Sequence, residues 1–454
     1  MNRLASWRAS GREVSVAGMA RSGLAATHLL RANGIAVYLS DQGDTGVLHA
    51  AADALAADGG AVVSVDIGRH DLDRVARSAA LILSPGIPPE SPVVEAAGAA
   101  GIPVLAEAQL GLGAMADIPA IVVTGTNGKT TTTAIVEHLL RAGGRRSVAA
   151  GNIGHPLSTV ALADPLPDWL AVELSSFQLH DAPDLAPAVG VLTNLAPDHL
   201  DRYPSLDAYY ADKARLFANA GPASIWVTNL DDIDSRRMIR GVPGRHLAFS
   251  TLVRADGWFD RDADQLMLAG EPLLARNDLP LLGDHNVANA LAAALAVHAT
   301  GVDRRSIANG LATFRALRHR MEPVREVEGV LWINDSKATN VASTRVAIQA
   351  MDRPFILLLG GRHKGEPYTD LVGPLCARGL AVIAYGEAGD LIEQDLSPAI
   401  RVVRGTTFED VVAKARVLAP PGGAVLLSPA CSSYDMFDNY EQRGAVFRAL
   451  VEGM

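Results

Sequence analysis

The sequence predicts an α/β protein of three domains, each built on a mostly parallel sheet. Its 454 residues are too many for one hydrophobic core, and ordinary domain sizes indicate about three domains. Short apolar runs also recur between Ala- and Leu-rich segments that have helical character. Runs that are apolar on both faces and separated by helices are typical of parallel strands in α/β sheets.

The apolar runs fall into three sets, one for each expected domain. The expected strands of the first set are residues 14–17, 35–39, 61–65 and 80–83; those of the second are 121–123, 170–172, 189–192 and 224–227; those of the third are 331–333, 355–359, 381–385 and 424–427. We expect domains at residues 1–107, 108–316 and 317–454. Residues 250–280 indicate a small hairpin-rich excursion within the second domain.

The composition narrows the class of protein. Hydrophobic residues make up 49% and charged residues 20%, which is ordinary for a soluble globular protein. Forty basic and fifty acidic residues give a net charge of −10, which argues against a nucleic-acid partner. A few lysines, arginines and backbone N–H groups can still bind a phosphate locally.

Cysteine use and hydropathy indicate where the protein works. The two cysteines, Cys376 and Cys431, fit neither a disulfide framework nor a zinc pattern, so a reducing compartment is the simpler interpretation. No apolar segment precedes Glu13, which argues against a secretory signal. The apolar stretch at 290–297 is far too short for a membrane span. We expect a cytoplasmic protein.

The strongest local pattern is Val-Val-Thr-Gly-Thr-Asn-Gly-Lys-Thr, which ends at Thr130 between an apolar run and a helical segment. Gly125 and Gly128 would let the backbone curl so that its N–H groups face phosphate oxygens. Lys129 would then reach the β- and γ-phosphates, and the Thr130 hydroxyl would bind Mg²⁺. Val123 stands where the general pattern has glycine. The alternative is an ordinary glycine turn with an exposed lysine.

Polar residues that follow other expected strands could join this loop. Glu173 ends one strand, and Asp198, His199 and Asp201 follow the next. Ligands of open α/β sheets bind beyond the carboxyl ends of the strands, and Mg²⁺ prefers oxygen ligands. The alternatives are a helix cap or salt bridge for Glu173 and a solvated loop histidine for His199. Lys213, taken alone, predicts a surface lysine on a helix.

The complete set of motifs resembles the Mur ligase family, which also includes folylpolyglutamate synthase. The motifs occur in the family's order at residues 124–130, 151–154, 173–178 and 285–289. Those at 319–322, 334–340, 428–435 and 439–444 resemble the branch that adds D-glutamate. The resemblance covers the chain from about Gly18 to Gly444. It implies a Rossmann-like N-terminal domain, a central P-loop ATPase-like domain with a mostly parallel sheet, and a C-terminal Rossmann-like α/β domain.

The resemblance also implies a reaction. Such ligases transfer the γ-phosphoryl group of ATP to a substrate carboxylate, and an incoming amine displaces phosphate from the acyl phosphate. The expected substrates are UDP-N-acetylmuramoyl-L-alanine and D-glutamate, in the synthesis of peptidoglycan precursors. ATP, two Mg²⁺ ions and a carbamate on Lys213 are the implied cofactors and modification, and the protein is expected to be a monomer.

Residue roles follow from the matched motifs. The implied catalytic residues are Lys129, His199 and Lys213, and the implied metal ligands are Thr130, Glu173, His199 and Lys213. The implied ATP contacts are Gly125, Thr126, Asn127, Gly128, Lys129, Thr130, Thr131, Asn286, Asn289, Arg320 and Asp335. The implied contacts of the UDP substrate are Ser22, Asp41, Gly86, Asn152 and Ser175. The implied contacts of D-glutamate are Lys337, Thr339, Lys364, Ser433 and Tyr440.

Three other functions compete with this interpretation. Gly18, Gly23 and Asp41 are Rossmann-like and would suit an NAD-dependent oxidoreductase, but Ala20 replaces the middle glycine and residues 124–130 stay unexplained. A nucleotide-binding regulatory protein would not need Lys337 or His199. A sibling ligase for another amino acid, or a glutamate-adding folate enzyme, is the third; a diaminopimelate-adding sibling should carry an Asp-Asn-Pro-Arg motif, which the third domain does not have.

Overall fold

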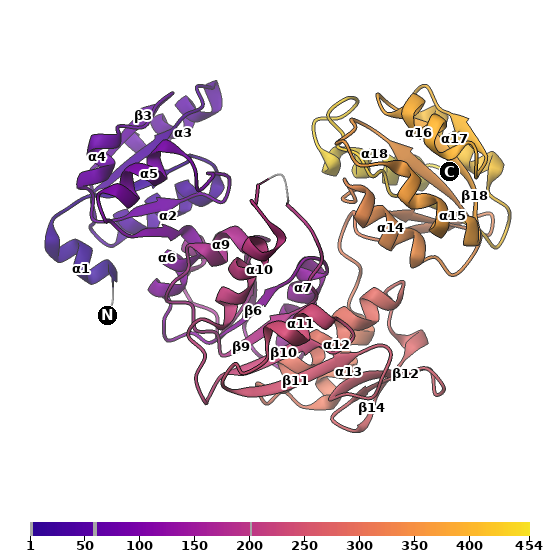
Figure 1. Cartoon of the computed structure of the whole chain (residues 1–454), viewed down its shortest axis with the longest axis horizontal. Coiled ribbons are helices and arrows are strands. Elements are labelled where there is room, and N and C mark those ends of the chain that lie inside the picture. The colour runs from indigo at the N-terminus through magenta and orange to yellow at the C-terminus, as the bar shows by residue number, and fades with distance from the viewer. Residues whose placement is uncertain (1–2, 58–60, 200–201) are drawn as a thin grey trace. The chain divides into compact units, whose positions relative to one another are not determined.

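Three mostly parallel sheets, of five, nine and six strands, organise the residues that the structure describes. This computed structural model describes residues 3–57, 61–199 and 202–454 (Figure 1) and confirms the predicted α/β class. By its contacts the chain forms two compact units, Met1–Arg276 with Ala288–Ala312 and Asn277–Val287 with Thr313–Met454. The first unit holds the first two sheets, so the expected joins near residues 107 and 316 stay predictions.

The first sheet has the parallel order β3-β2-β1-β4-β5. Its strands are β1 (Val14–Ala17), β2 (Val37–Asp41), β3 (Val63–Ile67), β4 (Leu81–Leu83) and β5 (Val104–Ala106). Its helices are α1 (Arg3–Ser10), α2 (Arg21–Ala32), α3 (Gly46–Ala57), α4 (Leu72–Arg77), α5 (Pro92–Ala99) and α6 (Glu107–Ala114). Val14 and Val16 pack on one face and Ala17 on the other. The strand order reverses between β1 and β4, where such sheets bind ligands.

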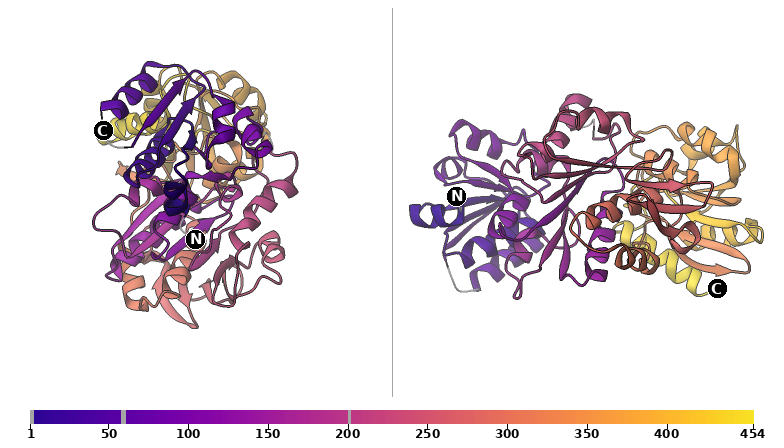
Figure 2. Two further views of the ribbon diagram at one scale, coloured as in Figure 1. Left: turned by 90° about the vertical axis from the view of Figure 1, so that its left-hand side faces the viewer. Right: turned by 90° about the horizontal axis from the view of Figure 1, so that it is seen from below.

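The second sheet has the order β14-β13-β12-β11-β10-β9-β6-β8-β7. Its strands are β6 (Ala120–Thr124), β7 (Ser147–Gly151), β8 (Trp169–Glu173), β9 (Val189–Leu192), β10 (Ile225–Asn229), β11 (Arg245–Ser250), β12 (Gly257–Asp260), β13 (Gln265–Leu268) and β14 (Glu271–Ala275). The antiparallel strands β12 to β14 extend it beyond β11 (Figures 1 and 2), which confirms the hairpin-rich excursion. Central strand β6 leads into the predicted phosphate loop.

The helices of this region differ widely in length. They are α7 (Lys129–Ala142), α8 (Leu157–Val160), α9 (Ser176–His180), α10 (Leu206–Ala214), α11 (Ile233–Met238), α12 (Asp284–His298) and α13 (Arg304–Thr313), with the short 3₁₀ helices η1 (Arg215–Phe217) and η2 (Arg276–Asp278). Val122, Val172 and Leu192, from three neighbouring strands, share one buried cluster. The sheet is therefore packed across the strands that carry the site.

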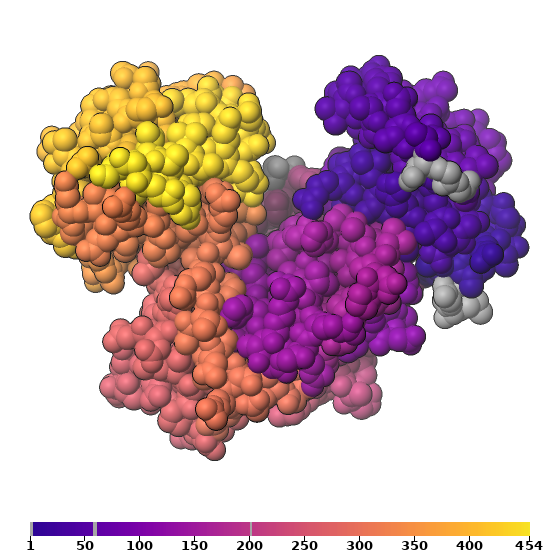
Figure 3. Space-filling model, turned by 180° about the vertical axis from the view of Figure 1, so that it is seen from behind, coloured from indigo at the N-terminus to yellow at the C-terminus, as the bar shows by residue number. Residues whose placement is uncertain are grey.

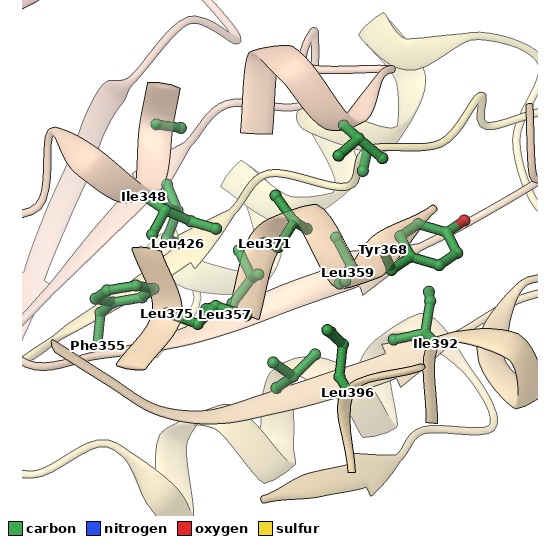
Figure 4. Packing of buried hydrophobic residues seen from close by; sticks show 14 of the residues in the cluster. Ile348, Phe355, Leu357, Leu359, Tyr368, Leu371, Leu375, Ile392, Leu396 and Leu426 are labelled. Atoms are coloured by element: carbon green, nitrogen blue, oxygen red, sulfur yellow. The ribbon is translucent and has the colours of Figure 1, made fainter. Parts of the chain in front are cut away.

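The third sheet has the order β15-β16-β20-β17-β18-β19, with only β15 antiparallel. Its strands are β15 (Glu322–Val327), β16 (Val330–Asn334), β17 (Phe355–Gly360), β18 (Gly379–Tyr385), β19 (Val402–Arg404) and β20 (Ala424–Leu427). Its helices are α14 (Val341–Gln349), η3 (Tyr368–Leu371), α15 (Val372–Arg378), α16 (Gly389–Leu396), α17 (Phe408–Leu418) and α18 (Tyr440–Glu452). Leu357 and Leu359 face the cluster that contains Leu371 (Figure 4), whereas Leu358 faces the opposite cluster.

Helices α6 and α8 join the first two sheets within one unit. A Cβ atom at Gly111 would lie 2.5 Å from the backbone carbon of Leu157, so only glycine fits there. The Oε1 atom of Glu107 accepts a hydrogen bond of 2.6 Å from the Ser158 N–H, and burial raises the pKa of Glu107. Residues of the first unit that reach the surface in the space-filling view are coloured from indigo through magenta (Figure 3). The close contact at Gly111 and the buried hydrogen bond of Glu107 pack the first two sheets together.

Within the described ranges, we find no helix with the length and apolar content that a membrane crossing requires.

Candidate active site

The phosphate loop depends on two glycines with left-handed backbones. Gly125 has φ +143° and Gly128 has φ +81°, a region that other residues rarely adopt. A Cβ atom would lie 2.0 Å from the Thr193 hydroxyl oxygen at Gly125, and 2.3 Å from the Asn289 Oδ1 atom at Gly128. The loop then ends where α7 begins at Lys129. The predicted strand, tight turn and helix are all present, and they direct a helix N-terminus at the site.

Two lysine side chains converge on this loop. Lys129 donates to the carbonyl oxygens of Gly125 at 2.9 Å and Thr126 at 2.7 Å. Lys213, on α10, donates to the same Gly125 oxygen at 2.7 Å. Its side chain is buried, so the interpretation of Lys213 as a surface lysine is wrong. Burial, followed by the positive charge of Lys129, holds the pKa of Lys213 well below its usual range, which favours a neutral amine.

Glu173 is the last residue of β8, and one of its carboxylate oxygens has no hydrogen-bond partner in the described chain. The Asn152 amide donates to its Oε1 atom at 2.7 Å, whereas Oε2 is buried without a partner in the described chain. The alternative role as a helix cap is wrong, because Ser175 caps α9 in a capping box with Gln178. A buried, unpartnered carboxylate oxygen fits a cation ligand, since an uncompensated buried charge is costly. The residues therefore fit Mg²⁺ at this strand end.

His199 lies in an exposed loop after β9. It has φ +54°, its Nε2 atom is 3.6 Å from Asp198, and its ring centroid is 5.4 Å from that of Phe177. Asp201 lies outside the described residues. Across residues 3–57, 61–199 and 202–454, no group of three or more His, Cys, Asp and Glu could hold a metal. The structure thus brings Lys129 and Lys213 together and leaves His199 at the surface.

Predicted substrate contacts in the first domain lie where β1, β2 and β4 end. Asp41 accepts from the N–H of Met19 at 2.7 Å and of Gly43 at 2.8 Å, so its carboxylate shapes the loop before α2. Ser22 lies in the first turn of α2, and Gly86 lies in the turn that follows β4. These positions form the edge at which the strand order reverses, as expected for a ligand-binding crevice.

In the second unit, four of the five predicted glutamate contacts form two pairs. The Lys337 ammonium lies 5.2 Å from the centre of the Tyr440 ring, and Lys364 donates to the Thr339 hydroxyl at 3.3 Å. Ser433 is buried. Two cations and hydroxyl groups suit a dicarboxylate.

The predicted nucleotide contacts are divided between the units. Asp335 accepts from the Met321 N–H at 3.1 Å and the Ser428 hydroxyl at 2.8 Å, and burial raises the pKa of Asp335 to about 7. Asn286 donates to the Leu282 carbonyl at 2.8 Å. In the first unit, Asn289 accepts from the Thr132 hydroxyl at 3.2 Å. Thr130 and Thr131 lie in the first turn of α7. Arg320 lies two residues before the start of β15.

Sequence reasoning gave no role to Arg443, a fully buried residue of α18. Its guanidinium donates to the Ser336 carbonyl at 2.8 Å and the Cys431 carbonyl at 3.2 Å. It thereby holds the loops next to Lys337 and Ser433. The available signal was its spacing from Phe447, since residues four apart share a helix face and Phe447 is a core residue.

A strand, a glycine-lysine-threonine loop and a helix dipole, on one of three α/β sheets, define a nucleotide-binding protein of the phosphate-loop class. Three family models match in order: "Mur ligase MurD-like, N-terminal domain" at residues 12–106, "Mur ligase middle domain" at 123–297 and "Mur ligase, glutamate ligase domain" at 319–431. The chain belongs to the Mur ligase family.

Curated relatives and solved structures agree with this assignment. The chain is 39% identical over 455 residues to the UDP-N-acetylmuramoylalanine–D-glutamate ligase of Salinibacter ruber, covering 96% of this chain and 97% of the relative. The ligase of the same name from Myxococcus xanthus is 38% identical, with 98% and 99% covered. UDP-N-acetylmuramate–alanine ligase of Thermotoga maritima has a TM-score of 0.61 at 18% identity, covering 97% and 99%. The MurF ligase of Thermotoga maritima, solved in complex with ADP, has a TM-score of 0.61 at 19% identity, covering 92% and 95%. These structures share the fold.

Proposed function

We propose that the protein is an ATP-dependent ligase that adds D-glutamate to UDP-N-acetylmuramoyl-L-alanine during peptidoglycan precursor synthesis. The observation that carries the proposal is that the chain's sequence is 39% identical to that of a D-glutamate ligase over 96% of this chain. Lys129 at the phosphate loop supports the ATP-dependent part, because a cation there neutralises a transferring phosphoryl group. We further propose that the enzyme works in the cytoplasm as a monomer.

The proposed reaction has two steps. The carboxylate of the L-alanyl group attacks the γ-phosphorus of ATP, which forms an acyl phosphate and releases ADP. The amine of D-glutamate then attacks the acyl carbon; phosphate leaves with the bonding electrons, and the amine loses a proton. The first step replaces a poor leaving group with a good one, so that the protein mainly positions reactants and neutralises charge.

The residues at the phosphate loop divide this work. Thr130 and the free Oε2 atom of Glu173 would hold one Mg²⁺, and His199 with Lys213 would hold a second. The ions, when bound, would polarise the phosphoryl oxygens and shield their charge. Lys129 would turn from the loop carbonyls toward the β- and γ-phosphates.

Lys213 needs a carbamate to act as a metal ligand, because an ammonium group repels cations. The lowered pKa of Lys213, caused first by burial, supports this modification, since only the neutral amine reacts with carbon dioxide. The resulting carboxylate oxygens are the ligands that Mg²⁺ prefers.

Substrate recognition is proposed for both ends of the chain. Ser22, Asp41 and Gly86 would contact the uridine diphosphate, and Asn152 with Ser175 the muramoyl-alanyl part. In the second unit Lys337, Thr339, Lys364, Ser433 and Tyr440 would bind the two carboxylates of D-glutamate. Asn286, Arg320 and Asp335 stay predicted contacts of the nucleotide.

Phosphate release by the purified protein tests the proposal. With ATP, Mg²⁺ and UDP-N-acetylmuramoyl-L-alanine, we expect sustained release only when D-glutamate is added. L-Glutamate and diaminopimelate serve as controls and should give none. Release with one of these instead would assign a different amino acid, and no release with any of them would refute the ligase activity.

A further inference from the structure

The segment that follows β9 is joined to the phosphate loop by hydrogen bonds beyond the end of the β6–β9 ladder. The paired strands end at Thr124 and Leu192, after which the two chains would be free to diverge. Instead, the Thr126 N–H donates to the Asn194 carbonyl oxygen at 2.9 Å. Ala196 donates its N–H to the Thr126 hydroxyl at 3.0 Å. The loop is therefore held along its length by residues 194–196.

The Asn194 side chain contacts both ends of one loop residue. Its Oδ1 atom accepts from the Asn127 N–H at 2.9 Å, and its Nδ2 atom donates to the Asn127 carbonyl oxygen at 3.0 Å. The amide orientation is fixed, because a flipped amide would place a donor against a donor and an acceptor against an acceptor. The Thr193 hydroxyl donates to the same carbonyl oxygen at 2.6 Å.

These hydrogen bonds determine which backbone N–H groups are left to donate to a bound anion. A trans peptide group is planar, with its C=O and N–H on opposite sides. Two donors hold the Asn127 carbonyl toward residues 193–194, so the Gly128 N–H of the same peptide points the other way. In the described part of the chain that N–H donates to no backbone carbonyl oxygen. If the peptide flipped, a carbonyl oxygen would face the phosphates and repel them.

We propose that Asn194 is a positioning residue of the proposed ligase, which holds the Asn127–Gly128 peptide so that its N–H faces the ATP phosphates. The proposal rests on the proposed function for its substrate, and it deepens the account of the nucleotide site. Asn194 acts through the loop and touches no reacting atom. Since residues 195–199 continue from it to His199, the same side chain fixes the starting point of that loop.

Asn194→Asp tests this role because the shape is conserved while the donor is lost. The carboxylate keeps an acceptor for the Asn127 N–H but places an oxygen against the Asn127 carbonyl. We expect ADP, measured by calorimetry with Mg²⁺, to bind roughly tenfold more weakly, the effect of one lost hydrogen bond and a new repulsion. KM for ATP should rise, whereas KM for D-glutamate should not change.

Asn219→Asp is the matched control, because Asn219 also bridges backbone groups in the same unit. Its amide donates to the carbonyl oxygens of Pro183 at 2.8 Å and Leu185 at 3.0 Å. ADP affinity should be the same in this variant as in the wild type. Loss of ADP affinity in Asn219→Asp equal to that in Asn194→Asp would mean that general destabilisation explains both, and would overturn the proposal.

Thr193→Val provides a second test if Asn194→Asp does not fold. It removes the other donor to the Asn127 carbonyl and should weaken ADP binding in the same direction. Unchanged ADP affinity in a folded Asn194→Asp or, failing that, in a folded Thr193→Val would overturn the proposal. A wild type that binds ADP but releases no phosphate with the substrates would refute only the proposed function, because the ADP affinities test Asn194 independently.

Discussion

The amine of Lys213 lies 2.7 Å from the Gly125 carbonyl oxygen, inside the core of the first unit. If a carbamate forms there, Lys213→Ala should lower kcat by roughly a hundredfold or more, the scale on which charge-stabilising groups contribute. Wild-type protein equilibrated with ¹³C-bicarbonate should show a carbamate resonance in its ¹³C NMR spectrum that the variant does not show. Lys414→Ala removes a lysine that pairs with Asp410 and is the control. An unchanged rate in Lys213→Ala would contradict this role.

Asp335 couples pH to the stability of the second unit. Burial raises the pKa of Asp335 in the folded protein to about 7, from an ordinary 3.8, so the folded state binds more protons between these pH values. The contribution of Asp335 to the free energy of unfolding is therefore fully present below pH 3.8 and is lost as the pH rises through 7. Asp335→Asn should remove this loss.

Urea unfolding at pH 5 and pH 8 measures that effect. Relative to the wild type, Asp335→Asn should be more stable at pH 8 than at pH 5. Asp438→Asn, a change at an exposed position, is the control for altered surface charge. A difference between Asp335→Asn and the wild type that is equal at the two pH values would contradict the prediction.

At the scale of elements, helix α6 contains two glycines, one in close contact with α8 and one with open space beside it. Gly111 meets the backbone of α8, whereas a Cβ at Gly113 would have nothing within 4 Å. Gly111→Ala should lower the free energy of unfolding by about 1–3 kcal/mol, the usual cost of overpacking. Gly113→Ala should be neutral or stabilising by about 0.5–1 kcal/mol, because alanine favours a helix.

Denaturant unfolding of the two variants is the measurement. Both changes add one methyl group to the same helix, so the main difference between the variants is the contact with α8. Equal stabilities of Gly111→Ala and Gly113→Ala would show that α6 and α8 are not closely packed in solution.

Three of the strands that the sequence did not predict, β7, β15 and β19, have identifiable physical features. All twelve expected strands are present, because each contains a run made up mostly of apolar residues. β7 reads Ser-Val-Ala-Ala-Gly and lies at a sheet edge, where apolar selection is weak. β15 contains Pro323 and alternating charges, and β19 has only three residues. Edge strands take their conformation from a neighbour, which a single segment of sequence does not record.

Some residues of the candidate site could also be predicted from the sequence, and others could not. Gly125 and Gly128 were predictable because their backbone angles demand glycine. The burial of Lys213 was not, since a lysine on a helix is buried only when neighbouring elements cover it. Asn194 was also not predictable, because its partner is the backbone of Asn127, which carries no signal in the sequence.

For the whole molecule, the two cysteines report folding through their reactivity. Cys376 is exposed and Cys431 is buried, where the Tyr368 hydroxyl lies 2.9 Å from its sulfur. Burial also raises the pKa of Cys431 to about 11, and the thiolate is the reactive form. With a thiol reagent at pH 8, one thiol should react rapidly in the native protein and the second only after denaturation. Cys376→Ser should leave no rapidly reacting thiol; rapid reaction of two thiols in the wild type would contradict the buried position.

Strand β14 at the margin of the nine-stranded sheet has a consequence for how copies of this protein behave when crowded. Its partner strand β13 changes register between Leu266 and Met267, opposite Pro272. A proline has no N–H to offer an incoming strand, and an irregular register disturbs the regular spacing that such a strand would need. The margin is thus a poor template for amyloid-like growth, so this edge of the nine-stranded sheet is protected against aggregation.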